Sequence, residues 1–157
     1  MKNKAVVVID TREQEPYSFD TGRIETVRCA LPAGDYSLLG YESAIAVERK
    51  SLEDLVGTLI RGRERFRSEL LKLQSYEYAC VVVEASITDM LSGRYRSGVH
   101  PNALLGSVIS IIADYNIPVF FCANRQAACL FVQELLLRLH RKADLRCQKQ
   151  DTKAAPG

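Results

Sequence analysis

The feature that most constrains the fold is a predicted β-hairpin that brings two acidic residues and a lysine together. Residues 35–50 read as two short apolar strands joined by a polar turn. A symmetric turn pairs Asp35 with Glu48 across the strands, which puts their Cβ atoms about 4.5–5.5 Å apart on one face of the sheet. Because side chains alternate along a strand, Lys50 lies on the same face as Glu48, while Arg49 points the other way.

Two carboxylates and an ammonium group at one spot are the groups that metal-assisted phosphodiester cleavage requires. Carboxylates about 5 Å apart repel by roughly 3 kcal/mol at an effective dielectric constant near 20, so they share a proton or bind a divalent cation. Mg²⁺ commonly takes one or two protein carboxylates and completes its shell with water and phosphate oxygens. Lys50 would orient the attacking water or stabilise the transition state. The alternative is a surface hairpin with solvated charges.

Further acidic residues are predicted near this pair. Asp10 ends the apolar run 5–9, which has the length of a buried strand, and Glu13 follows one turn later. Asp54 stands three residues after Ser51, a spacing that also forms a helix capping box, so its alternative role is to begin a helix. No Cys or His pair has metal-site spacing, which favours a hard, oxygen-ligated ion over zinc.

These motifs resemble the nuclease domain of the XPF-type structure-specific endonucleases over about residues 5–140. The central pattern is Gly-Asp, a spacer, Glu-Arg-Lys, three residues and Asp, and the chain meets it with Gly34, Asp35, Glu48, Arg49, Lys50 and Asp54. Two further elements, Asp-x-Arg-Glu and Gly-Arg, are met by Asp10, Arg12, Glu13, Gly62 and Arg63. The resemblance implies an α/β, restriction-endonuclease-like PD-(D/E)XK fold with a central mixed β-sheet flanked by helices. It also implies Mg²⁺ or Mn²⁺ dependence and cleavage of branched DNA near single-strand/double-strand junctions.

The resemblance implies a role for each residue of the site. Asp35 and Glu48 would bind the metal directly, with the Arg49 backbone carbonyl as a further ligand. Asp10 would hold the metal or a metal-bound water, and Lys50 would complete the catalytic group. The residues that would order the site or bind phosphate are Arg12, Glu13, Arg49, Asp54 and Arg63. Glu84, which ends a predicted strand over 78–84, either supports the site or caps the following turn.

Charge distribution indicates where DNA could bind. The net charge of +2 is too small to indicate nucleic acid by itself. Residues 61–67, however, carry four arginines and one acid. Next to a phosphate-cleaving site these arginines are candidate contacts to the DNA backbone, namely Arg61, Arg63, Arg65 and Arg67. The alternative is a solvated helix face.

Two strongly apolar helices predict an association surface. The helices expected over about 101–115 and 124–140 carry apolar side chains on more than one stripe, although a peripheral helix needs only one. We therefore expect a homodimer, or a heterodimer with a related subunit, through residues 101–140. The alternative buries both helices inside the monomer.

Composition predicts one nuclease domain over residues 1–142, followed by a disordered tail over 143–157 that lacks apolar periodicity. The nuclease pattern begins within about ten residues of the start, so we expect neither the helicase domain nor the helix-hairpin-helix module common in this family. No signal peptide or membrane span is visible. We expect an intracellular protein, in the cytoplasm or nucleoid, or in the nucleus of a eukaryote.

The sequence thus predicts a divalent-metal-dependent DNA endonuclease that acts on branched, flap or fork structures in DNA repair or recombination. One alternative is a non-catalytic dimerisation or DNA-docking subunit. Such a subunit would be expected to lose acid or lysine positions, all of which this chain keeps. The other alternative is a junction resolvase or restriction-type nuclease of the same fold.

Overall fold

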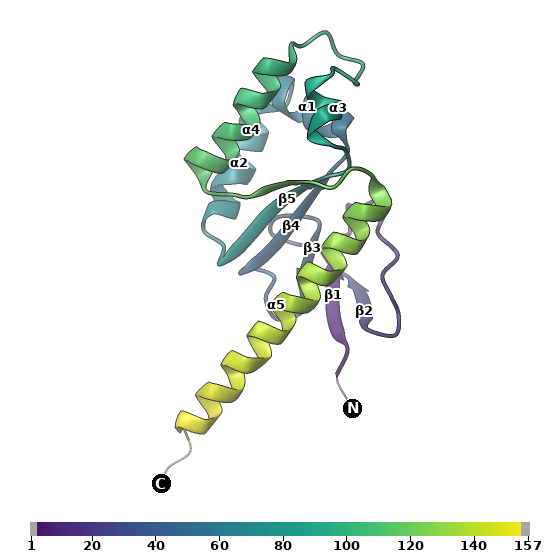
Figure 1. Ribbon diagram of the computed structural model, residues 1–157. Helices are drawn as coiled ribbons and strands as arrows, with labels where there is room; N and C mark the ends of the chain where they lie inside the picture. Colours follow the sequence, from purple (N-terminus) through teal and green to yellow (C-terminus); the bar gives the residue numbers. More distant parts are fainter. Residues whose placement is uncertain (1–2, 155–157) are drawn as a thin grey trace.

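A mixed six-stranded sheet with helices on both faces forms the centre of the molecule (Figure 1). The computed structural model describes residues 3–154. The strands are β1 (Ala5–Ile9), β2 (Ile24–Arg28), β3 (Tyr36–Leu38), β4 (Ile45–Lys50), β5 (Tyr78–Val83) and β6 (Val119–Phe121). Their order is β2-β1-β3-β4-β5-β6, with β3 antiparallel to both of its neighbours and the other pairs parallel. The predicted α/β architecture is confirmed.

The helices divide unequally between the two faces of the sheet. One face is covered by α1 (Leu52–Ile60), α2 (Arg63–Gln74), α3 (Ile87–Leu91) and α4 (Pro101–Tyr115), and the other by α5 (Arg125–Ala154) (Figure 1). Each face has its own apolar core, because side chains alternate along β4. Ala46 packs with the α1–α4 side, whereas Val47 packs with the α5 side.

The α5 core includes aromatic side chains from the long loop between β1 and β2. Tyr17 stacks on Tyr36 with 5.3 Å between ring centroids, and Phe19 meets Tyr36 edge to face. The Tyr36 hydroxyl accepts a hydrogen bond of 2.8 Å from the Tyr17 backbone N–H. The segment is irregular, but its two aromatic rings are buried.

The hairpin register is the predicted one. Tyr36 pairs with Val47, so the preceding residue, Asp35, lies opposite Glu48. The Asp35 backbone N–H donates a 2.9 Å hydrogen bond to the Val47 carbonyl. Gly34 brings the chain to this point with a φ of +78°, and a Cβ there would lie 3.1 Å from the Ala46 Cβ. Both its backbone conformation and its close approach to β4 therefore require glycine.

The helix after β4 begins as its sequence predicts. The Ser51 hydroxyl accepts a hydrogen bond from the Asp54 N–H, and the Asp54 carboxylate accepts one from the Ser51 N–H, which completes a capping box. The cap fixes the direction in which the chain leaves Lys50.

The predicted disorder after residue 142 is wrong for residues 143–154, because α5 continues to Ala154. Two contacts hold the start of this extension to the body: Arg146 pairs with Glu77, and the Tyr41 hydroxyl lies 3.7 Å from the Cys147 Sγ. Beyond them the helix is polar and exposed and projects past the sheet (Figure 1). Residues 155–157 lie outside the described residues, and the 1–142 domain boundary stays a prediction.

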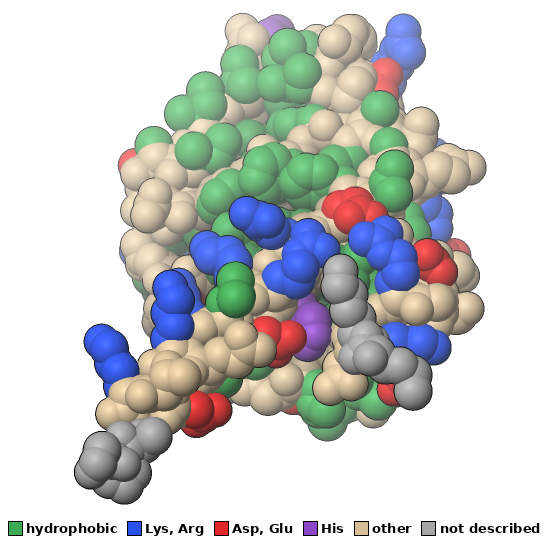
Figure 2. Space-filling model, turned by 60° about the horizontal axis from the view of Figure 1, so that its bottom comes forward, with side chains coloured by type: hydrophobic (Ala, Val, Ile, Leu, Met, Phe, Trp, Pro, Cys, Tyr) green, Lys and Arg blue, Asp and Glu red, His purple; other side chains and the backbone are tan. Residues whose placement is uncertain are grey.

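Part of the apolar surface of α4 and α5 is exposed. On α4, the side chains of Leu104, Val108 and Ile111 are buried. Ile109 of the same helix is 52% exposed, and Ile112 is 44% exposed. Leu130 of α5 is 60% exposed, and β6 is an edge strand of the sheet. Figure 2 shows hydrophobic side chains gathered in a band beside a group of Lys and Arg side chains.

None of the helices within residues 3–154 is both long enough and apolar enough to cross a membrane.

The close approach at Gly34 generates a stability prediction. Gly34→Ala places an L side chain in the left-handed region and against Ala46, so we expect the free energy of unfolding to fall by about 1–3 kcal/mol. Gly40→Ala is the matched control, because Gly40 has a φ of +86° but open space around a built Cβ. Urea unfolding should show the larger loss for Gly34→Ala. Equal losses would contradict the close approach to β4.

Candidate active site

A cavity of about 410 Å³ opens where β1 and β4 end and β3 begins. The four residues predicted to be catalytic, Asp10, Asp35, Glu48 and Lys50, all line it, together with Arg12. Its other wall comes from α1 and α2, through Gly57, Thr58, Gly62, Arg65, Phe66 and Glu69. Side chains from distant parts of the sequence thus meet in one space.

Burial dominates the electrostatics of the two central carboxyl groups. It raises the pKa of Asp35 to about 6, although a 2.7 Å hydrogen bond from the Arg49 backbone N–H acts in the opposite direction. Burial, and then the charge of Asp35, raises the pKa of Glu48 well above its usual value. The Lys50 ammonium lies 3.3 Å from Glu48 Oε1 and offsets part of this cost. Without a bound cation, the pair is therefore a poor site for two negative charges.

Asp10 is held differently from the other two acids. Its carboxylate accepts a 2.8 Å hydrogen bond from the Arg12 Nε and another of 2.8 Å from the Leu31 backbone N–H. Burial alone would raise the pKa of Asp10, but these hydrogen bonds outweigh it and lower the pKa. Asp10 is thus a charged, oriented carboxylate that lines the cavity and is paired with the Arg12 guanidinium.

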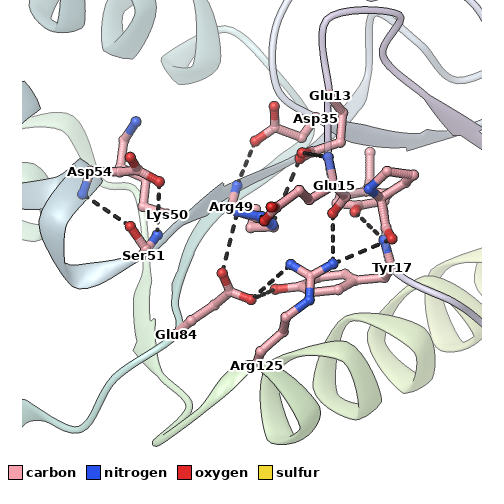
Figure 3. A network of polar contacts seen from close by, with 12 residues as sticks. Glu13, Glu15, Tyr17, Asp35, Arg49, Lys50, Ser51, Asp54, Glu84 and Arg125 are labelled. Carbon is pink, nitrogen blue, oxygen red and sulfur yellow. Dashed lines mark hydrogen bonds and ion pairs between the residues drawn. The ribbon is translucent and has the colours of Figure 1, made fainter.

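On the opposite face of β4, Arg49 lies in a buried network (Figure 3). Its guanidinium is 3.2 Å from Glu84 at Nη1 and 3.7 Å from Glu13 at Nε. Glu84 also pairs with Arg125 at the start of α5, at 3.4 Å, and accepts a 3.0 Å hydrogen bond from the Tyr17 hydroxyl. The network connects the strand that carries Glu48 and Lys50 to α5.

The supporting residues divide between this network and a helix cap. Glu13 and Glu84 contact Arg49 and do not line the catalytic cavity. Glu84 therefore lies against Arg49 rather than capping the turn that follows it. Asp54 is exposed in the capping box of α1, so its observed contact is the helix-start one. These residues order the elements around the cavity from outside it.

Two residues of α2, Arg65 and Glu69, line the cavity, but only one of them was predicted from the sequence. Arg65 belongs to the predicted arginine run, but Glu69 was not predicted as a site residue. They are four residues apart, so they share one face of the helix. The charge of Glu69 contributes to the raised pKa of both Asp35 and Glu48. The helical spacing from Arg65 is the signal that could have identified Glu69.

The other three arginines of the run face elsewhere. Arg63 and Arg67, again four residues apart, line a groove of about 390 Å³ between α2 and α4. Arg61 lines a third cavity, on the far side of α1. Arg63, Arg65 and Arg67 lie on α2, where residues two apart point about 200° from each other. Arg61 instead lies at the end of α1, so the run divides among three sites.

The donor set fits a hard divalent cation. Asp35 and Glu48 offer carboxylate oxygens at a site whose buried negative charge lacks full compensation. Within residues 3–154 there is no group of three or more His, Cys, Asp or Glu side chains that could hold an ion by itself. Two protein carboxylates with water and phosphate oxygens are the shell that Mg²⁺ commonly takes, so the pair fits Mg²⁺ or Mn²⁺ in the presence of substrate.

The chain resembles known nuclease domains in both sequence and structure. Residues 9–135 match the family model described as the ERCC4 domain. XPF from Aeropyrum pernix is 26% identical to the chain in each of two solved structures. Its TM-score is 0.67 for XPF alone and 0.70 for XPF in complex with DNA. These matches cover 86% and 89% of the chain but 61% and 66% of the XPF chains. The predicted family resemblance and restriction-endonuclease-like fold are confirmed.

A relative of much greater length also matches. The Methanocaldococcus jannaschii protein MJ1505, whose name describes an ATP-dependent RNA helicase, is 29% identical to the chain over 145 residues. The match covers 92% of the chain and 16% of MJ1505. The chain therefore spans less than two thirds of each relative described.

The raised pKa of Asp35 generates a pH prediction for the metal-free protein. Between its ordinary pKa of 3.8 and about 6, folded Asp35 holds a proton that the unfolded chain has lost, so stability falls as pH rises through this range. At pH 7 in EDTA, Asp35→Asn should therefore raise the free energy of unfolding, by about 1–3 kcal/mol. Asp54→Asn, outside the cavity, should give no such gain. Urea unfolding that finds Asp35→Asn less stable than wild type at pH 7 would contradict this electrostatic picture.

Proposed function

The chain belongs to the ERCC4 domain family, and from this premise we propose that it is a divalent-metal-dependent DNA endonuclease. The observation that carries the proposal is the meeting of Asp35, Glu48 and Lys50 in one cavity beside an oriented Asp10. Two acids and a lysine that line one cavity match the chemistry of hydrolytic phosphodiester cleavage. An inactive subunit of the same fold would have no need for this costly burial of like charges.

The metal-binding step falls to Asp35 and Glu48. Their carboxylates would hold Mg²⁺ or Mn²⁺, with the Arg49 backbone carbonyl as a further ligand. When bound, the cation polarises the scissile phosphate and acidifies a water molecule. Because burial raises the pKa of both carboxyl groups, a bound cation would compensate the negative charge that the site otherwise disfavours.

Lys50 and Asp10 would act on the attacking water. The Lys50 ammonium is held between Glu48, at 3.3 Å, and the face of the Phe66 ring, at 5.0 Å from its centroid. From there it can orient the water or stabilise charge on the phosphate oxygens. Asp10, fixed by Arg12, would bind the metal or a water on it. Arg12 and Arg65 border the same cavity and are the proposed contacts to the substrate phosphates.

The substrate class rests on the family. We propose branched DNA, with flaps and forks as its typical forms, and a role in DNA repair or recombination. A crystallised relative, XPF from Aeropyrum pernix, was solved in complex with DNA. A junction resolvase or restriction-type nuclease would use the same residues on a different DNA structure. The alternative of a non-catalytic docking subunit is disfavoured by the complete set of catalytic residues.

Cleavage of labelled flap, fork, four-way and linear duplex DNA tests the proposal. Wild type should cut a branched substrate with Mg²⁺ or Mn²⁺ and not in EDTA. Asp35→Ala and Lys50→Ala should each lower the rate by at least about 100-fold, because each removes a group that acts on the reacting phosphate. Lys72→Ala, which removes the same charge from the end of α2, is the matched control and should cut normally.

Two results would overturn the proposed nuclease. Undiminished turnover by folded Asp35→Ala would remove the metal site from the mechanism. Failure of folded wild type to cut any of the four substrates would instead favour the docking subunit.

The proposed association surface is the exposed apolar face of α4, β6 and α5. Ile109 and Ile112 are exposed on α4, and β6 is an edge strand of the sheet. We propose that a second copy or a related subunit covers them. Ile109→Glu combined with Ile112→Glu should convert a dimer to a folded monomer in light scattering at about 10 µM protein. Leu145→Glu, equally exposed on the polar part of α5, is the control. A monomer mass for wild type would contradict this surface.

A further inference from the structure

A glycine in the middle of α1 has no structural explanation within the folded chain. Gly57 lies inside the helix, where glycine is the least favourable residue after proline. Its φ is outside the positive range, and a Cβ built on it meets no atom within 4 Å. Neither backbone conformation nor packing therefore requires glycine here. What remains is the space above it, which a side chain would fill.

Gly57 borders two cavities. It lines the catalytic cavity and also the cavity of about 460 Å³ on the other side of α1 that Arg61 lines. The second cavity lies between the end of α1, with Arg61, and the loop before α4, with Arg96 and Gly98. The loop is tied to α1 by a 3.0 Å hydrogen bond from the Arg96 backbone N–H to Glu53, whose carboxylate is the one acid lining this cavity.

The charges at the two ends of this path suit a polyanion. Lys50, Arg12 and Arg65 border the catalytic end, which also contains Glu69 and the acids that would hold the divalent cation. Arg61 and Arg96 border the other end, and both side chains are exposed. Arg94, two residues before Arg96, is by contrast paired with Asp89 at 3.1 Å. The path over Gly57 thus has cations at each end and a bare helix backbone between them.

We infer that one strand of the DNA substrate crosses α1 directly over Gly57. The scissile phosphate lies in the catalytic cavity, and phosphates further along the strand contact Arg61 and Arg96. A backbone without a side chain lets the sugar-phosphate chain approach the helix closely. The identity of the polymer rests on the proposed function, whereas the path rests on the shared wall of the two cavities.

The sequence predicts DNA contacts for all four arginines of residues 61–67, but only two of them border this path. Arg65 and Arg61 stand at its two ends. Arg67 points about 200° away from Arg65 and lines the α2–α4 groove with Ser107 and Tyr115. Arg67→Ala removes the same charge from the same segment without touching the path, so it is a charge-matched control.

The first test replaces Gly57 and measures stability and DNA binding together. Gly57→Ala should raise the melting temperature by about 2–4 °C, because alanine favours the helix and nothing obstructs its Cβ. In EDTA, where no cleavage proceeds, its Kd for fluorescein-labelled flap DNA should rise at least about fivefold, and that of Gly57→Leu further. A glycine needed only for folding would give a lower melting temperature. Unchanged Kd values for both variants would overturn the path.

The second test uses the salt dependence of the same binding. Each lost phosphate contact lowers the slope of log Kd against log salt concentration by about 1. Arg61→Ala and Arg96→Ala should each show this loss, and Arg67→Ala should keep the wild-type slope. A loss for Arg67→Ala equal to that for Arg61→Ala would show a diffuse electrostatic effect and overturn the path.

Binding and cleavage are read separately, so the path and the proposed nuclease can fail independently. If wild type cuts DNA but the Gly57, Arg61 and Arg96 variants bind normally, the path is wrong and the nuclease stands. If these variants lose DNA affinity but wild type cuts no substrate with any metal, the nuclease is wrong and the path stands. Failure of folded wild type to bind DNA would overturn both.

Discussion

The antiparallel pairing of β3 with β4 is the constraint on which the rest of the site depends. It sets Asp35 opposite Glu48 through the Tyr36–Val47 register, and the glycine before Asp35 allows the chain to approach β4 closely. A shift of one residue would turn Glu48 and Lys50 to the opposite face of the sheet. The pairing thus forces together two carboxyl groups whose pKa values are both raised by burial, with the charge of Asp35 raising that of Glu48 further. A divalent cation would offset this cost of burying negative charge.

The two faces of β4 have different roles: one lines the proposed catalytic cavity, and the other packs into a buried ionic network. Glu48 and Lys50 face the cavity, while Arg49 between them points into the network with Glu84 and Glu13. Glu84 pairs both with Arg49 of β4 and with Arg125 of α5, so the network connects the active-site strand to α5. The same helix carries part of the exposed apolar face. Loss of one member of such a buried ionic network leaves its partners unpaired, a destabilising change. A partner bound at α5 therefore contacts the same helix that steadies the active-site strand.

The predictions that the structure confirms in most detail came from local sequence patterns. The period of two along β4 predicted which side chains share a face, and the Ser51–Asp54 spacing predicted the start of α1. Contacts between segments that are distant in the sequence could not be predicted from such local patterns. Glu69 reaches the cavity only because α2 packs across the sheet, and the arginine run divides only once the neighbours of α2 are known. The helical extension of α5 was missed because polar, exposed turns carry no apolar period, although contacts to Glu77 and Tyr41 support their start.

The central claim is that Asp35 and Glu48 form one metal site, and anomalous scattering tests it most directly. Crystals of the protein soaked in Mn²⁺, with diffraction data collected near the manganese absorption edge, locate the ion without any assumption about activity. The account predicts an anomalous peak between the Asp35 and Glu48 carboxylates, in the cavity beside Lys50, and no such peak in Asp35→Asn crystals. A peak elsewhere, or an undiminished peak in the Asp35→Asn crystals, would contradict it.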